Sequence, residues 1–91
     1  MIVGKVIKYN GKKYVITDLI NNENFWSCGF DRIYKVIELE KVNLMLNEIV
    51  DKSLEQEIVV KNVTSLPFET IENEEFILEK KYVFTIKKKD K

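Results

Sequence analysis

The side chains best suited to chemistry in this sequence are carboxylates from its central third. Six glutamates form this group: Glu55, Glu57, Glu69, Glu72, Glu74 and Glu75. Carboxylates gathered on one surface can hold a divalent cation or steer a basic partner toward that surface. The Asp-x-Asp-x-Asx-Gly spacing of a calcium-binding loop is absent from the sequence, so contact with a basic partner is favoured.

Residues that commonly carry catalysis are scarce. The chain has no histidine, which is the commonest general base and metal ligand, and Cys28 is its single cysteine. Ser53 and Ser65 have neither a histidine partner nor a Gly-x-Ser-x-Gly turn, so an activated nucleophile is not expected. We therefore expect no catalytic activity, no cofactor and no metal ion.

Charge is sorted along the chain, although 15 basic and 15 acidic side chains cancel in total. Residues 1–35 carry six basic and three acidic side chains, residues 36–79 carry three and eleven, and residues 80–91 carry six and one. Separate fields of this kind can engage a charged partner. The acidic middle is expected to contact a basic protein, above all a nucleic-acid-handling one whose groove it could occupy by imitating phosphate spacing.

The predicted partner-binding residues combine acidic and aromatic side chains, because charge steers an encounter while buried aromatics hold a complex. They are Glu69, Glu72, Glu74, Glu75, Phe25 and Phe68. The favoured function is a small non-catalytic inhibitor or modulator of a basic, nucleic-acid-handling protein. A composition rich in Lys, Ile, Asn and Glu is common in accessory genes of low-GC bacteria and their phages, which favours a phage or mobile-element origin.

Two other functions stay open. The chain could bind single-stranded nucleic acid through lysines that contact phosphates and aromatics that stack on bases. The residues for this role are Lys5, Lys8, Tyr9, Lys12, Lys13, Trp26 and Arg32. The third function is an assembly or scaffold subunit, which would form homo-oligomers by pairing along an exposed strand edge.

The clearest structural signal is Asn10-Gly11, which separates two runs rich in Val, Ile and Tyr, residues 2–9 and 12–19. This dipeptide tolerates the positive φ of a type I′ turn and predicts a hairpin. The polar residues 21–24 predict a turn. Beyond them, residues 25–39 predict either two extended segments with a bend near Gly29 or one long bulged strand.

The period changes in the second half. Apolar residues at three- and four-residue steps predict an amphipathic helix over residues 40–52, and a β-branched run predicts a strand over 58–63 that ends before Pro67. The helical stripe consists of Val42, Met45, Leu46, Ile49 and Val50. Alternating polarity from Phe76 to Ile86 predicts one long, half-buried strand.

These elements predict an α+β domain dominated by a small antiparallel, barrel-like sheet with one helix, in the order β-β-β-α-β-β. This is the order of an oligonucleotide-binding (OB) fold, or of an SH3-like barrel if the helix shrinks to a turn. Residues 1–86 are expected to form one domain and 87–91 a charged tail. The early polar residues and the lack of an apolar run of about 20 residues predict a cytoplasmic protein without membrane contact.

Overall fold

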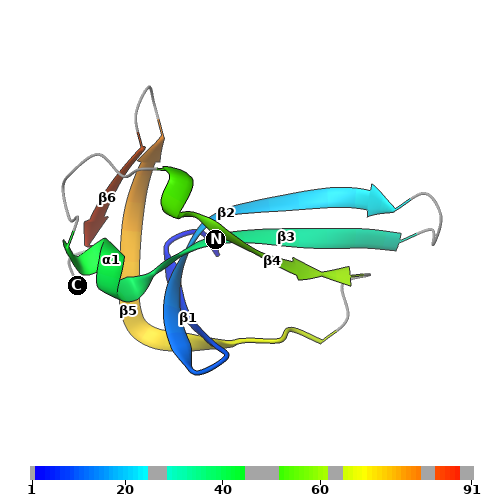
Figure 1. Cartoon of the computed structure of the whole chain (residues 1–91), viewed down its shortest axis with the longest axis horizontal. Helices are drawn as coiled ribbons and strands as arrows, with labels where there is room; N and C mark the ends of the chain where they lie inside the picture. The colour runs from blue at the N-terminus through cyan, green and yellow to red at the C-terminus, as the bar shows by residue number, and fades with distance from the viewer. Residues whose placement is uncertain (1, 25–28, 45–51, 62–64, 81–83, 89–91) are drawn as a thin grey trace.

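The computed structural model describes residues 2–24, 29–44, 52–61, 65–80 and 84–88. Six strands form an antiparallel sheet in the order β4-β3-β2-β1-β5-β6, accompanied by one short helix (Figure 1). The elements are β1 Lys5–Tyr9, β2 Lys12–Asn24, β3 Gly29–Glu38, α1 Leu39–Leu44, β4 Gln56–Val60, β5 Glu69–Lys80 and β6 Phe84–Lys88. The predicted class, a small antiparallel sheet with one helix, is confirmed. The sheet is not closed by the described strands, so a barrel of the OB or SH3 type stays a prediction.

The β1–β2 hairpin forms at the predicted turn. Asn10 has φ of 50° and Gly11 has φ of 79°, as a type I′ turn requires at its two central residues. Tyr9 faces Lys12 across this turn, and the pairing continues to Val6 opposite Val15. The dipeptide therefore sets the register of the first two strands.

The predicted turn at residues 21–24 is wrong, because β2 continues through them to Asn24. Asn21 and Asn22 pair with Arg32 and Asp31 of β3, so the two strands form a long arm (Figure 1). Asn21 and Asn22 are exposed, and their polarity suits a part of the arm that faces water. A strand that faces water and a turn both consist of polar residues, so the sequence pattern does not distinguish them.

The single long strand predicted over the last third is also wrong. The chain reverses after Lys80, and β5 and β6 form a hairpin in which Leu78 lies opposite Ile86. Side chains directly opposite in an antiparallel pair share a face, so residues of the same parity meet on both sides of this turn. The alternation could not reveal the reversal for that reason. β6 continues to Lys88 and includes the first two residues of the predicted tail.

The helix is described over Leu39–Leu44, followed by a 3₁₀ turn at Lys52–Leu54. The rest of the predicted stripe, residues 45–51, lies outside the described residues. Val42 is fully buried, so α1 packs on the sheet through this side chain. The predicted strand over 58–63 is observed as β4, and residues 62–63 lie outside the described residues. No helix within the described ranges is long and apolar enough to cross a membrane.

The central strands are buried on both faces. The helix core consists of Val6, Val15, Ile37, Val42, Phe76 and Ile86. The aromatic core consists of Ile7, Tyr14, Ile16, Tyr34, Val36, Ile58, Val60 and Phe68. Neighbours such as Val6 and Ile7 enter different cores because successive side chains of a strand point to opposite faces. A continuous apolar run in β1 to β3 therefore supplies two cores at once.

Candidate binding surface

The four glutamates of the predicted binding set all lie within the first seven residues of β5. Val6 of β1 pairs with Ile71, but Lys5 pairs with Glu75, so residues 72–74 have no register partner in β1. An insertion of this kind bends a strand. In Figure 1, β5 bends strongly, and its pairing with β1 resumes at Glu75 after the irregularity. The bend places Glu72 and Glu74 at a corner of the sheet.

Lysines of β1 stand beside two of these carboxylates. The Lys5 Nζ lies 3.3 Å from the Glu75 Oε1, and Lys8 is the register partner of Glu69. Glu72 is exposed to solvent. The four acidic groups therefore share one strand, but they do not form an uninterrupted acidic field.

Glu74 is the fourth of these residues and is only half-exposed. Its Oε2 is buried and has no hydrogen-bond partner among the described residues. A buried carboxylate oxygen without a donor is energetically costly.

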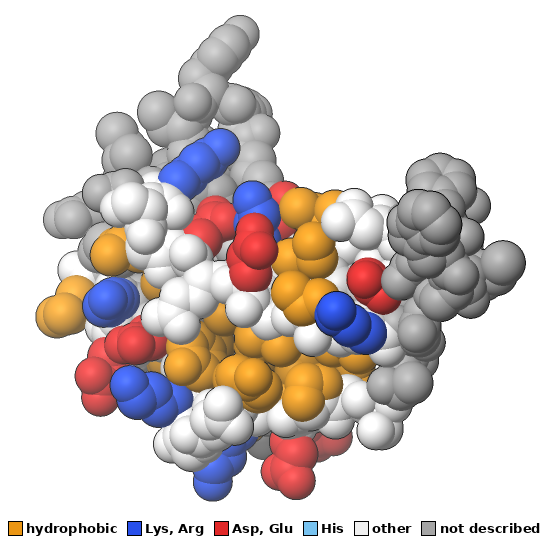
Figure 2. All heavy atoms as spheres, turned by 45° about the vertical axis from the view of Figure 1, so that its right-hand side comes forward, with side chains coloured by type: hydrophobic (Ala, Val, Ile, Leu, Met, Phe, Trp, Pro, Cys, Tyr) orange, Lys and Arg blue, Asp and Glu red, His pale blue; other side chains and the backbone are white. Residues whose placement is uncertain are grey.

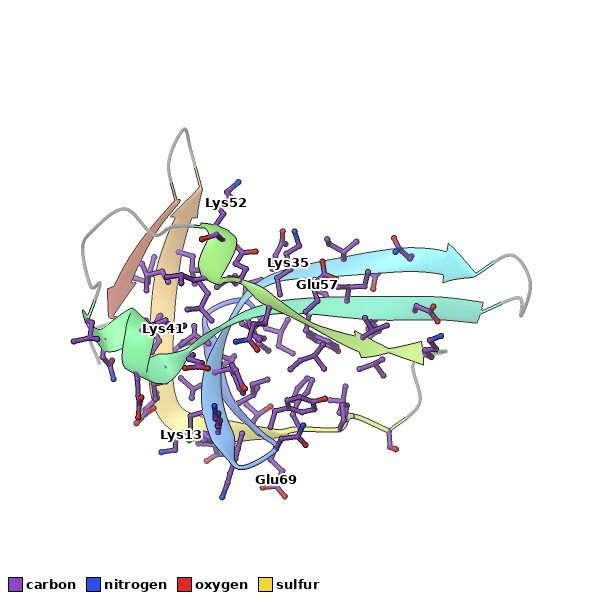
Figure 3. The ribbon with its side chains drawn as sticks, in the orientation of Figure 1. Lys13, Lys35, Lys41, Lys52, Glu57 and Glu69 are labelled. Carbon is purple, nitrogen blue, oxygen red and sulfur yellow. The ribbon has the colours of Figure 1, made fainter. Side chains whose placement is uncertain are left out.

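An open pocket lies where β5 begins beside the β1–β2 turn, and we refer to it as the Glu69 pocket. Its volume is about 420 Å³, and it is lined by Lys8, Asn10, Gly11, Leu66, Pro67, Phe68 and Glu69. Leu66 is 47% exposed, and Figure 3 shows Glu69 at the end of the molecule formed by this turn. The pocket thus combines an apolar wall with a carboxylate at its rim.

Phe68 belongs mainly to the protein interior. It is 7% exposed and contacts Tyr34 edge to face, with 5.0 Å between the ring centroids. The ring supports the floor of the Glu69 pocket, while Leu66 and Pro67 offer the accessible apolar surface. Phe25, the other expected aromatic anchor, lies outside the described residues.

Strand parity divides the expected nucleic-acid-binding residues between two faces. Lys8 lies opposite Lys13, two residues along from Val6, and both lysines are exposed on the side of the helix core. Tyr9 and Lys12 lie opposite each other on the side of the aromatic core. Lys8 and Lys13 therefore lie on the side of the sheet opposite to Tyr9 and Lys12.

The remaining members of that set are scattered. Tyr9 packs edge-on against the buried Tyr14, with 6.3 Å between their rings. Arg32 lies in β3 opposite Val60, on the arm, while Lys5 is next to Glu75. Trp26 lies outside the described residues.

A second pocket of about 330 Å³ lies on the other side of the β1–β2 turn, next to α1. It is lined by Gly11, Lys12, Lys13, Glu38, Leu39, Glu40 and Asn43. The Lys12 Nζ lies 3.8 Å from the Glu38 Oε1, and both signs of charge occur around it. This pocket selects no particular class of charged ligand.

The described residues contain no group of three or more His, Cys, Asp or Glu side chains that could hold a metal ion. Comparison with protein families, curated proteins and solved structures finds no match for this chain. The function is therefore inferred from the surface of the protein. Figure 2 shows one face on which hydrophobic side chains occupy a broad central area with acidic and basic side chains around it.

Sequence reasoning missed Leu66 and Pro67 as pocket residues. A signal was present, because a leucine beside a strand-ending proline directly precedes the Phe68-Glu69 pair. From the sequence, Pro67 predicts only the end of a strand. The apposition of this segment with Asn10 and Gly11 is a tertiary contact, 55 residues apart in sequence from Gly11 to Leu66, and no local pattern predicts it.

Proposed function

We propose that this protein is a small, non-catalytic binding protein that contacts a basic segment of a protein partner at the Glu69 pocket. One observation carries this function: an exposed carboxylate, Glu69, borders an apolar wall made by Leu66 and Pro67. Lysine and arginine have apolar stems and charged heads. Such a side chain can lay its stem on the apolar wall and present its head to the carboxylate.

The corner of β5 extends this contact. Glu72 is exposed, and the buried Oε2 of Glu74 lacks a donor among the described residues. A second basic side chain of the partner would meet these two carboxylates. Charge would then steer the encounter, and apolar contact at Leu66 would hold it.

The partner is proposed to be a nucleic-acid-handling protein whose activity is blocked or adjusted. Basic segments are the means by which such proteins contact phosphates. Because Lys5 and Lys8 stand among the β5 glutamates, contact with a short basic segment is favoured over an extended imitation of a phosphate backbone. Modulation through a small patch is therefore the preferred form of this function.

The first test measures binding of a fluorescent Lys/Arg-rich peptide by anisotropy during a salt titration. Glu69→Lys should weaken peptide binding by about tenfold, because the rim carboxylate is replaced by a second ammonium beside Lys8. Leu66→Ser should weaken it by a similar factor through loss of apolar contact. Circular dichroism verifies that each variant is folded.

Glu40→Lys is the matched control for charge. Glu40 is an exposed carboxylate on α1, so this variant has the same net charge as Glu69→Lys. Equal weakening by the two variants would mean that only net charge matters, and the pocket would lose its role. Binding of a labelled single-stranded oligonucleotide in preference to the peptide would instead support nucleic-acid binding.

A further inference from the structure

The outer edge of β4 is the part of the sheet at which a second molecule could add a strand. β4 ends the strand order and pairs with β3 along one side only. None of the backbone hydrogen bonds outside the strand ladders of the described residues involves Gln56–Val60. Unpaired N–H and C=O groups at a sheet edge form a template for another strand.

The face of the sheet beside this edge carries two ordered rows. Ile20, Ile33 and Val59 are register neighbours across β2, β3 and β4, and Val59 is 48% exposed. An apolar row thus runs to the free edge and stops there. A strand added to β4 would bury Val59 if it brought an apolar residue opposite to it.

The neighbouring row alternates in charge. Asp18, Lys35 and Glu57 are register neighbours across the same three strands, and Figure 3 shows Lys35 and Glu57 close together. The sequence of signs is negative, positive, negative. An added strand would continue this row if it placed a cation opposite Glu57.

The sequence of β4 and its next residue, Gln-Glu-Ile-Val-Val-Lys, meets both requirements itself. In an antiparallel pair of two copies centred on Val59, Val59 lies opposite Val59, Ile58 opposite Val60, and Glu57 opposite Lys61 of the second copy. Antiparallel partners share a face, and these pairs satisfy that condition. Lys61 is exposed and directly follows β4 in a 3₁₀ conformation, so its pairing with Glu57 requires β4 to extend by one residue in the dimer.

Other registers are poorer. Centring the pair on Ile58 would place Glu57 opposite Val59, and centring it on Glu57 would place two glutamates together. Like charges directly opposite destabilise a pair, and a charge opposite an apolar side chain gains no ion pair. Only the register centred on Val59 matches each of these side chains with a suitable partner.

We propose that β4 is a homodimerisation edge, at which two copies join antiparallel about a two-fold axis at Val59 to form one continuous sheet. The apolar row then spans both molecules from Ile20 to Ile20. The charge row gains a cation next to each Glu57. The same patch serves both copies, as a closed two-fold interface requires.

The contact is small, since β4 is five residues long. Interfaces at the low end of the size range are transient, so we expect a dissociation constant on the order of 10–100 μM. The dimer edge and the Glu69 pocket share no residue. Loss of dimerisation therefore leaves peptide binding by one copy unchanged, and the two functions fail separately.

Charge exchange across the interface is the experiment that tests the register. Sedimentation equilibrium of the full chain over a concentration series should give a monomer–dimer transition. Glu57→Lys alone and Lys61→Glu alone should each weaken dimerisation by at least about tenfold, because each sets like charges opposite at two symmetric places. Mixing these two variants should restore the dimer, since each pair of like charges is replaced by a Lys–Glu pair in the mixed dimer.

Two further variants separate the interface from effects on folding. Val59→Lys should give a monomer with an unchanged circular dichroism spectrum. Leu44→Lys changes a side chain on α1 that is 82% exposed and should leave the dimer intact. A wild-type chain that stays monomeric at several hundred micromolar, on the order of ten times the expected dissociation constant, overturns the dimer. A mixture that fails to recover dimerisation overturns the register centred on Val59.

Discussion

Gly4 shows how much of this fold depends on a single backbone conformation. Its N–H donates to the carbonyl oxygen of Ile16 at 2.7 Å, and its carbonyl oxygen accepts from the Phe76 N–H at 2.9 Å. The residue is buried, has φ of +96° and leaves no room for a Cβ, which would collide with the Phe76 carbonyl oxygen. Gly4 thus links β2 and β5 at the point where the chain enters β1.

Gly4→Ala should lower the free energy of unfolding by about 3 kcal/mol, since it adds a positive-φ penalty to a steric clash with backbone. Gly11→Ala is the matched control, because Gly11 has φ of +79° but no atom within 4 Å of an added Cβ. Its cost should be about 1 kcal/mol. Urea unfolding followed by circular dichroism measures both. Equal costs would show that the close approach at Phe76 does not matter.

At the scale of elements, α1 packs on the sheet through Val42 and the partly buried Leu39. Val42 is its fully buried residue, in contact with the helix core, whereas Leu44 is 82% exposed. A short helix gains most of its stability from such packing rather than from helix propensity. Among the described residues of α1, Val42 is therefore expected to contribute most to its attachment.

Val42→Ala should reduce the free energy of unfolding by about 2 kcal/mol, through lost methyl burial and the cavity left behind. Leu44→Ala on the same helix should change it by less than about 0.5 kcal/mol. Thermal and urea melts of the two variants provide the comparison. A negligible change in the free energy of unfolding for Val42→Ala would mean that the helix core is stable without the contact from α1.

The same scale explains what the sequence could and could not predict. The Asn10-Gly11 turn was predictable because these two adjacent residues tolerate the positive φ angles that the turn requires. The β5–β6 reversal was not, since Leu78 and Ile86 keep one parity whether the strand continues or folds back. For the candidate site, Glu69 was predictable from charge, but its pairing with Lys8 depends on which strands become neighbours.

At the scale of the molecule, strand order accounts for the sorted charges. β1 carries two lysines and β6 carries two, without acidic residues, while β5 carries five glutamates and one lysine. The sheet order places β5 between β1 and β6. Charge blocks that look like separate fields in the sequence therefore become adjacent strands of opposite sign. Between β1 and β5 the opposite charges face each other directly, as Lys5 with Glu75 and Lys8 with Glu69, and such pairs stabilise the contact of the two strands.

Reversing one block should accordingly destabilise the fold, and reversing its neighbour should restore it. Lys5→Glu with Lys8→Glu sets like charges opposite Glu75 and Glu69, and should cost about 1–2 kcal/mol for the two pairs. Adding Glu69→Lys and Glu75→Lys should recover most of this loss, because opposite charges again face each other.

Urea unfolding at low salt and in about 1 M NaCl separates charge from packing, because a Debye length of about 3 Å screens exposed pairs. Lys41→Glu with Lys52→Glu makes the same change in net charge at exposed positions outside the sheet and is the control. If the double variant loses more stability than the control and the fourfold variant regains it, opposite charges stabilise the pairing of β1 with β5. A cost that persists unchanged in high salt, without recovery in the fourfold variant, would assign the effect to packing and leave the order of charge blocks unexplained.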